Sequence, residues 1–157
     1  MTGLVHDERG YPIIDKSVTE KLLSRLLRKV RDNRDRLVDY ELYPSDIDKA
    51  DAVIVAYGSI ASIAKLAVKY IRESGYKVVL FRPKVLWPMP DKELCKVVEG
   101  HGVEKVVVVE MNYGQYLHTI KAALINCPKP CRFVSVTPGF YPSARVLAQE
   151  IEEVIKT

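Results

Sequence analysis

The sequence predicts an α/β protein in which helices cover both faces of a mostly parallel sheet. Four short runs rich in valine and isoleucine lie along the chain, at residues 52–57, 78–81, 106–109 and 133–136. Continuous apolar runs of this length are typical of strands that are buried on both faces. Amphipathic segments follow each run, and we expect helices over residues 60–74, 91–99, 114–125 and 143–155. The alternation predicts four strand–helix units in a three-layer α/β/α sandwich.

The N-terminal part of the chain has a different pattern. Residues 1–15 carry glycine, proline and charges without periodicity, which indicates an extended lead-in. A helix should follow, with Ser17 as its N-cap and Glu20 three residues later completing a capping box. One side of that helix is apolar, through Leu22, Leu23, Leu26, Leu27 and Val30. We therefore divide the chain into an N-terminal arm, residues 1–38, and one α/β domain, residues 39–157.

The net charge is concentrated in this arm. The chain of 157 residues, a length that suits one domain, has 24 lysines and arginines against 20 acidic residues, a formal charge of +4. Eight of the basic residues and only three acidic ones lie between Lys16 and Arg36, so the rest of the chain is about neutral. A solvated or partner-facing helix is the default interpretation. Nucleic-acid binding through this basic helix is a disfavoured alternative, because such binders interleave aromatic residues with the charges.

Composition also bears on the compartment and on the cysteines. No signal peptide or membrane-length apolar segment is recognisable, which predicts a cytoplasmic protein without membrane contact. The three cysteines are Cys95, Cys127 and Cys131. In a reducing compartment they should remain thiols, and the alternative is a small loop closed by Cys127 and Cys131, as in hyperthermophiles. An iron–sulfur cluster needs four thiolates, so this chain alone should hold none.

The turns that follow the strands are where ligands bind in open α/β sheets. In the first turn, Gly58 permits a tight bend and the Ser59 hydroxyl either caps the next helix or helps to hold an anion. The pair Gly100 and Gly102 follows a helix instead of a strand, so it does not match a dinucleotide fingerprint. The histidines are not spaced to share a proton or a metal and should be surface residues: His6, His101 and His118.

The second turn is stiffened by three prolines and contains the only tryptophan of the chain. Leu86, Trp87 and Met89 make it an apolar loop at the carboxyl edge of the predicted sheet. Two interpretations remain open. Trp87 anchors a partner surface, since aromatic residues dominate interface energetics, or it folds back onto the following helix.

The third turn places polar groups just beyond a strand. Glu110 ends the apolar run, and Asn112, Tyr113 and Gln115 follow. The cluster either binds a polar ligand or contains an N-cap at Asn112 with Gln115 reaching back to it. The second interpretation leaves Glu110 unexplained, and a lone carboxylate has no evident partner for acid–base chemistry.

The second and third turns carry a resemblance to a known family. The run R-P-x-x-L-W-P-x-P at residues 82–90, followed by E-x-N-x-G-Q at residues 110–115, closely resembles the C-terminal portion of the alpha subunit of 2-oxoacid:ferredoxin oxidoreductases. Residues 2–10, T-G-L-V-H-D-E-R-G, resemble the segment with which that subunit leaves its pyrimidine-binding domain. The resemblance covers nearly the whole chain.

The resemblance implies a transketolase C-terminal-like fold. Its sheet has five strands in the order 1-3-2-4-5, with an antiparallel first strand for which residues 40–43 are the candidate. The arm, residues 1–38, would be the linker from a pyrimidine-binding domain. The parent enzyme uses thiamine diphosphate with magnesium, an iron–sulfur cluster and coenzyme A to convert a 2-oxoacid to an acyl-CoA, and passes the electrons to ferredoxin.

For this chain the resemblance implies a structural role. It lacks the Gly-Asp-Gly segment of the magnesium–diphosphate site, so we expect no catalytic, cofactor-binding or metal residues and a part in assembly with the pyrimidine-binding domain and the beta and gamma components. The expected interface residues are Gly58, Ser59, Arg82, Pro83, Leu86, Trp87, Pro88, Glu110, Asn112, Tyr113 and Gln115. The alternative is a free-standing flavodoxin-like or receiver-like binding module. It is disfavoured because neither a hydroxyl-rich phosphate loop nor an acidic pair follows the first buried strand.

Overall fold

A computed structural model describes residues 4–46 and 48–157, so that Thr2 and Gly3 of the lead-in lie outside the described residues. The chain divides into two compact units, one ending at Val38 and the other beginning at Asp39. Each unit is described by itself below.

The second unit is built on a five-stranded sheet of order β1-β3-β2-β4-β5. Strand β1 is antiparallel to β3, and all the other neighbouring strands are parallel. This confirms the expected strand order and the antiparallel first strand. The strands are β1 (Tyr40–Tyr43), β2 (Ala52–Ala56), β3 (Val78–Pro83), β4 (Lys105–Glu110) and β5 (Cys131–Ser135).

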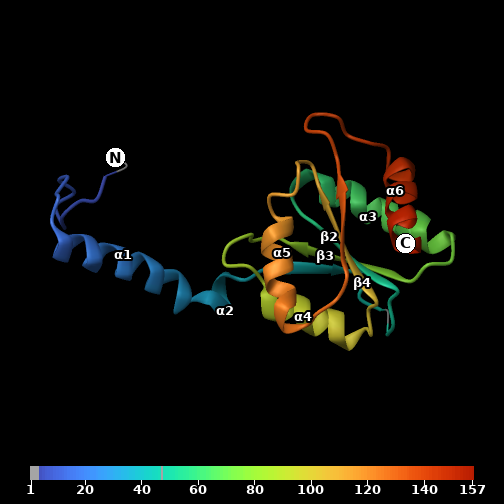
Figure 1. Cartoon of the computed structure of the whole chain (residues 1–157), viewed down its shortest axis with the longest axis horizontal. Coiled ribbons are helices and arrows are strands. Elements are labelled where there is room, and N and C mark those ends of the chain that lie inside the picture. Colours follow the sequence, from blue (N-terminus) through green and yellow to red (C-terminus); the bar gives the residue numbers. More distant parts are fainter. Residues whose placement is uncertain (1–3, 47) are drawn as a thin grey trace. The chain divides into compact units, whose positions relative to one another are not determined.

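Helices cover both faces of this sheet (Figure 1). One face carries α3 (Gly58–Glu73) and α6 (Ala144–Lys156), and the other carries α4 (Asp91–Gly100), α5 (Leu117–Ala123) and the short 3-10 helix η1 (Leu124–Asn126). Alternate residues of a strand point to opposite faces, so Ile54 packs under α3 and α6 while Val53 and Val55 pack under α4 and α5. All five residues of β2 are fully buried, which is why its sequence is continuously apolar.

An ion pair network holds the edge strand β1 to the rest of this unit. Glu41 of β1 receives a hydrogen bond from the Lys65 ammonium of α3 and lies 3.3 Å from an Arg82 nitrogen of β3. The Lys65 ammonium also lies 4.6 Å from the centre of the Tyr43 ring. The Lys65 hydrogen bond is the main reason that the pKa of Glu41 lies below its ordinary value.

The prediction for the cysteines is wrong. A disulfide joins Cys95 of α4 to Cys127, which follows η1, and Cys131 is the free thiol. The prediction considered only sequence proximity, whereas the sheet brings α4 and the end of η1 together from 32 residues apart. The Cys127–Cys131 pairing and the all-thiol state are both corrected by this contact.

The first unit consists of an N-terminal turn, α1 (Lys16–Arg31) and the single-turn α2 (Arg34–Leu37). Helix α1 begins earlier than predicted, because the Asp15 carboxylate, and not Ser17, accepts the hydrogen bond from the Val18 amide at 2.9 Å. The lead-in is a tight turn and not simply extended, with a bridge between His6 and Pro12.

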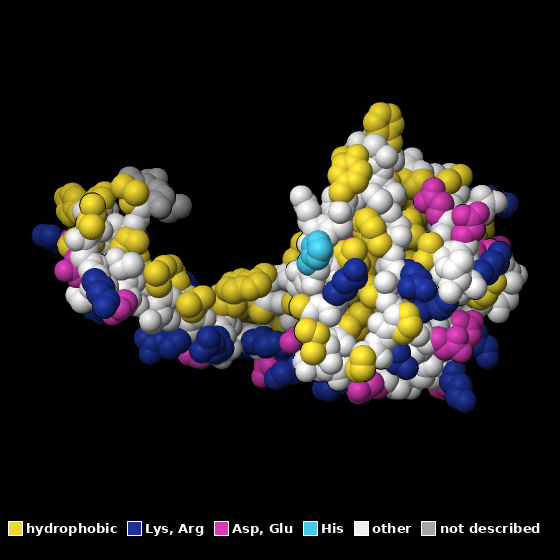
Figure 2. All heavy atoms as spheres, in the orientation of Figure 1, with side chains coloured by type: hydrophobic (Ala, Val, Ile, Leu, Met, Phe, Trp, Pro, Cys, Tyr) yellow, Lys and Arg dark blue, Asp and Glu magenta, His cyan; other side chains and the backbone are white. Residues whose placement is uncertain are grey.

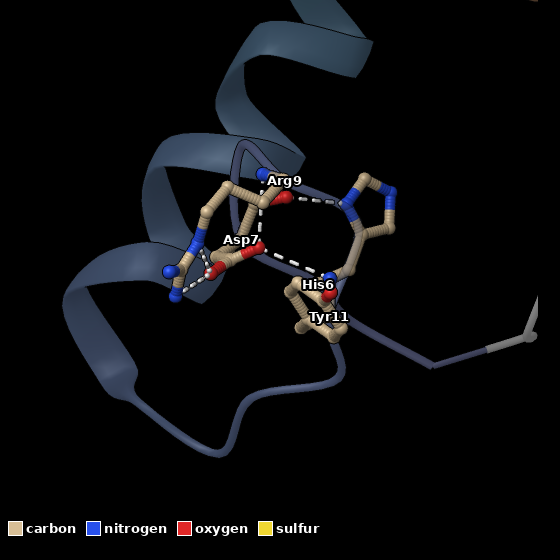
Figure 3. Close-up of polar contacts among 4 residues, drawn as sticks. All are labelled: His6, Asp7, Arg9 and Tyr11. Atoms are coloured by element: carbon tan, nitrogen blue, oxygen red, sulfur yellow. Dashed lines mark hydrogen bonds and ion pairs between the residues drawn. The ribbon is translucent and has the colours of Figure 1, made fainter.

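Asp7 organises this turn (Figure 3). Its carboxylate accepts hydrogen bonds from the backbone amides of Arg9 at 2.9 Å and Tyr11 at 3.0 Å, and also from the Arg9 guanidinium. Desolvation acts to raise the pKa of Asp7, but these hydrogen bonds outweigh it and leave the pKa below its ordinary value.

Helix α1 is amphipathic and has no buried residue. Figure 2 shows hydrophobic side chains gathered along one side of this helix and lysines and arginines along the other. The stripe predicted from the sequence exists, but its unit covers it only in part: Leu22 and Val30 are partly buried, and Leu23, Leu26 and Leu27 are exposed. None of the helices in the described parts of the chain is long and apolar enough to span a membrane.

Candidate functional site

The turns that leave β2, β3, β4 and β5 meet at one edge of the sheet, because these four strands are parallel. The first three of these turns supplied the site residues expected from the sequence, and they lie at the same edge as the turn that follows β5.

Glu110 lies at the centre of this edge. It ends β4, is fully buried and has a carboxylate that accepts three hydrogen bonds. The Leu117 amide donates to Oε1 at 2.7 Å, and the Tyr116 amide donates to Oε2 at 2.9 Å. The third donor is the Tyr57 hydroxyl, 3.1 Å from Oε2. Two of the free amides at the start of α5 thus point at a carboxylate, which explains why a charged group is buried here.

Asn112 shapes the turn between Glu110 and α5. Its Oδ1 accepts from the Gly114 amide at 2.7 Å and from the Gln115 amide at 3.0 Å, while its Nδ2 donates to the Tyr57 hydroxyl oxygen at 2.9 Å. The prediction of an N-cap at Asn112 is wrong, because α5 begins only at Leu117. Asn112 instead closes the turn before the helix, and Gln115 takes part through its backbone amide.

Two tyrosine hydroxyls complete this polar cluster beneath the edge. Burial, followed by the charge of Glu110, raises the pKa of Tyr57, and burial, followed by the charges of Tyr57 and Glu110, raises the pKa of Tyr116. Both phenols therefore stay protonated and able to donate. The rings of Tyr57 and Tyr116 meet edge to face with their centres 5.1 Å apart.

The Trp87 loop is tied to this cluster through Tyr116. The Tyr116 hydroxyl donates to the Leu86 carbonyl oxygen at 3.2 Å and lies 2.8 Å from the Met89 sulfur. Trp87 itself is 66% exposed, which overturns the fold-back interpretation. The peptide bond between Trp87 and Pro88 is cis.

Two residues predicted in this loop belong to the strand before it. Arg82 lies in β3 opposite Glu41, and Pro83 ends β3 opposite Tyr40. Strand β3 is longer than its apolar run, because pairing with β1 continues past Phe81. Arg82 therefore lies in the ion pair network of β1.

The first turn also differs from its prediction. Helix α3 begins at Gly58, which has a positive φ of 60° that suits glycine, and Ser59 lies inside its first turn. The Ser59 hydroxyl does not cap the helix. It lies 3.2 Å from the Tyr141 hydroxyl of the fourth turn.

Sequence reasoning missed this fourth turn, between β5 and α6. Phe140 is 75% exposed and Tyr141 is also exposed. The Phe140 amide donates to the Thr137 carbonyl at 3.1 Å, and Gly139 has a φ of 85°, so the segment is a defined β-turn. Two aromatic residues beside Pro138 and Gly139 were the available signal.

Three of these turns, those that follow β3, β4 and β5, present what we call the carboxyl-edge surface. It consists of Leu86, Trp87, Tyr113, Phe140 and Tyr141, of which Tyr113 is 80% exposed. Figure 2 shows hydrophobic side chains at the place where Figure 1 has the tip of the loop before α6. Exposed aromatic groups on ordered turns are the features of a binding surface for another protein.

The chemistry of this edge does not fit a magnesium–diphosphate site. The oxygens of Glu110 are already engaged by three donors, so this carboxylate is not free to ligate a cation. Within residues 4–46 and 48–157, no three histidine, cysteine or acidic side chains come together as a metal site requires.

A hollow of about 670 Å³ lies in the first unit between the N-terminal turn and α1. Its walls include two ion pairs, Asp7 with Arg9 and Glu8 with Lys21, so most of its charges neutralise each other. We regard the carboxyl-edge surface as the better candidate site.

A three-layer sandwich with this strand order and an antiparallel first strand defines the class of transketolase C-terminal-like domains. A split-gene transketolase, solved as an inactive beta4 tetramer, shares this fold at a TM-score of 0.60 and 19% identity, over 75% of this chain and 41% of that chain. The structure of a 2-oxoglutarate:ferredoxin oxidoreductase from Magnetococcus marinus, with 2-oxoglutarate, coenzyme A and succinyl-CoA bound, matches 98% of this chain and 26% of that chain. Its TM-score is 0.76 and its identity 26%.

Residues 50–146 match the family described as pyruvate:ferredoxin oxidoreductase core domain II, and the chain belongs to this family. The 2-oxoglutarate synthase subunit KorA of Methanocaldococcus jannaschii is 39% identical over 121 residues, which cover 77% of this chain and 31% of that subunit. The chain thus spans about a third of the length of this relative.

Proposed function

We propose that this chain is the non-catalytic assembly domain of the alpha subunit of a cytoplasmic 2-oxoacid:ferredoxin oxidoreductase. The observation that carries the proposal is the carboxyl-edge surface, in which exposed aromatic side chains stand on turns that a buried polar cluster holds in place. Trp87 and Tyr113 are the most suitable anchors, because both are largely exposed while their loops are fixed from below by Tyr116 and Glu110.

The proposed occupant of this surface is the rest of the oxidoreductase. About two thirds of the KorA relative lies outside the part that this chain matches, and that remainder would include the pyrimidine-binding domain. The beta and gamma components complete the assembly, and the arm would connect to the pyrimidine-binding domain. The exposed leucine stripe of α1 gives the same assembly a second contact.

In this proposal the complex, and not this chain, holds thiamine diphosphate, magnesium, the iron–sulfur cluster and coenzyme A. When bound, these groups supply the decarboxylation of a 2-oxoacid, the transfer of electrons to ferredoxin and the capture of the acyl group. This chain meets ferredoxin only indirectly. Leu86, Trp87, Tyr113 and Gln115 make contacts, and Glu110 fixes the turn beneath them.

Reconstitution tests the assembly role. The chain is mixed with the remaining subunits, and coenzyme A-dependent reduction of a dye by a 2-oxoacid is measured together with the size of the complex. We expect both complex formation and activity to require the chain. If omission of the chain left assembly and activity unchanged, the proposed function would be wrong.

Two alanine variants and a control locate the contact. Trp87→Ala and Tyr113→Ala should weaken assembly by about thirtyfold or more each, because truncating an interface anchor costs about 2 kcal/mol or more. Ile125→Ala is the matched control, since Ile125 is equally exposed but lies on η1, toward the opposite edge of the sheet. If all three substitutions changed assembly equally, the carboxyl-edge surface would not be the interface.

A further inference from the structure

The disulfide between Cys95 and Cys127 lies in the helical layer that supports the carboxyl-edge surface. Helix α4 begins just after the Trp87 loop, and α5 begins just after the Glu110 turn. Near the carboxyl edge the two segments are joined by the Tyr116 hydroxyl, which bonds to the Leu86 carbonyl. Farther along, the only covalent link between them is the disulfide.

Apart from the disulfide, few interactions order the segment that contains α5, η1 and the connection to β5. Helix α5 has seven residues and η1 has three, which is shorter than helices that are stable by themselves. Pro128 and Pro130 in the connection to β5 have no backbone donor. The other contributions are the hydrogen bonds of the Tyr116 and Leu117 amides to Glu110, at the start of α5, and the packing of Leu117, Ile120 and Leu124 under the sheet.

The two cysteines of the disulfide differ in exposure. Cys95 is half-buried, whereas Cys127 is almost fully buried. A small thiolate would therefore attack the Cys95 sulfur and displace the Cys127 sulfur as the leaving group. Burial raises the pKa of the Cys131 thiol, which keeps it protonated and a poor competitor in this exchange.

We propose that Cys95 and Cys127 form a redox-sensitive clamp on the layer of α4, α5 and η1. In the disulfide state the clamp fixes α5 and η1 against α4, and in the dithiol state this segment opens locally while the sheet remains folded. Reduction by a low-molecular-weight dithiol transfers two electrons and two protons to the cysteines and leaves the dithiol as its own disulfide. Oxidation by a low-molecular-weight disulfide reverses the exchange and releases two small thiols.

Hydrogen exchange of the full chain, read by mass spectrometry, tests the clamp. One sample is incubated with dithiothreitol and one with glutathione disulfide, and non-reducing peptide mapping establishes the cysteine state of each. We expect peptides that cover residues 117–127 to exchange about tenfold or more faster in the dithiol state, because removing a crosslink frees the segment it closes. Peptides of β2 and α3 should exchange equally in both samples.

Two variants serve as controls. Cys95→Ser should exchange rapidly at residues 117–127 in either reagent, and Cys131→Ser should behave as the unsubstituted chain does. The proposal is overturned if mapping finds no Cys95–Cys127 link after oxidation, or if exchange of residues 117–127 is the same in both cysteine states.

A consequence for assembly rests on the proposed function. The oxidised chain should associate with the remaining subunits and the reduced chain less well. If neither state associates while exchange responds to reduction, the proposed function fails and the clamp stands. If both associate equally and exchange does not respond, the clamp fails and the proposed function stands.

Discussion

Helices α1 and α3 have the same length, 16 residues, and both are amphipathic, yet only one of them is buried. Helix α3 lies on the sheet through small or branched residues such as Ala64, Ala67 and Ile71, which let it approach closely. Helix α1 carries leucines and no buried residue. The comparison shows that an amphipathic pattern defines a face for packing, whereas the neighbour that covers this face depends on the rest of the fold.

The largest predicted effect is a difference in unfolding free energy between a substitution in α3 and one in α1. Ile71→Ala in α3 should lower the free energy of unfolding by about 2–5 kcal/mol, because it leaves a cavity in a fully buried site. Leu26→Ala in α1 should change it by less than about 0.5 kcal/mol, since Leu26 is 46% exposed. Urea unfolding followed by circular dichroism measures both. A large loss of stability for Leu26→Ala would mean that this chain covers the stripe itself.

The second effect concerns the polar cluster of the carboxyl edge. Glu110→Ala should cost roughly 2–4 kcal/mol, because it leaves the Tyr116 and Leu117 amides without an acceptor. Tyr57→Phe removes one of the three donors to Glu110 and the acceptor of the Asn112 amide, and should cost about 1–2 kcal/mol. Thermal unfolding of the two variants checks this order. A reversed order would show that the carboxylate does not organise the turn.

The smallest predicted effect is the pH-dependent stability contributed by the Lys65–Glu41 pair, which we compare with that of the Lys21–Glu8 pair. The Lys65 hydrogen bond lowers the pKa of Glu41 below its ordinary value of 4.5, so the pair stabilises the fold above that pH. This stability is lost as the pH falls below 4.5 and through the lowered pKa of Glu41. Glu41→Gln should therefore destabilise the protein at pH 7 and flatten the acid side of its stability profile.

The matched control is the pair of the first unit. Lys21 similarly lowers the pKa of Glu8, with their charged atoms 2.5 Å apart, but both side chains are exposed and solvent screens them. Glu8→Gln should leave the midpoint of urea unfolding unchanged at every pH. If the midpoint of Glu8→Gln shifted with pH as much as that of Glu41→Gln, the exposed pair would stabilise the protein as much as the partly buried pair does, contrary to this prediction.

The sequence predicted the layers of the domain and located three of the four turns at the carboxyl edge of the sheet. Runs such as residues 52–57 indicate buried strands because only doubly covered strands tolerate continuous apolar residues. The motif around Trp87 indicated the family, and residues 50–146 match it. The place of the antiparallel strand was expected from this resemblance and not from any local signal.

Other features depended on contacts between residues far apart in the chain. Glu110 has no interpretable role until the Tyr57 hydroxyl, 53 residues away, and the start of α5 converge on its carboxylate. The disulfide pairs Cys95 with Cys127 because two helices share one face of the sheet.

The sequence by itself therefore determined the four buried strands and the approximate extent of the helices between them, since hydrophobic periodicity is local. Only the tertiary structure decided which polar groups meet, which cysteines pair and that Trp87 stays exposed while Tyr116 beneath it is buried. The physical reason is that hydrogen bonds and disulfides need their atoms within a few ångströms, and spacing along the chain does not fix such distances.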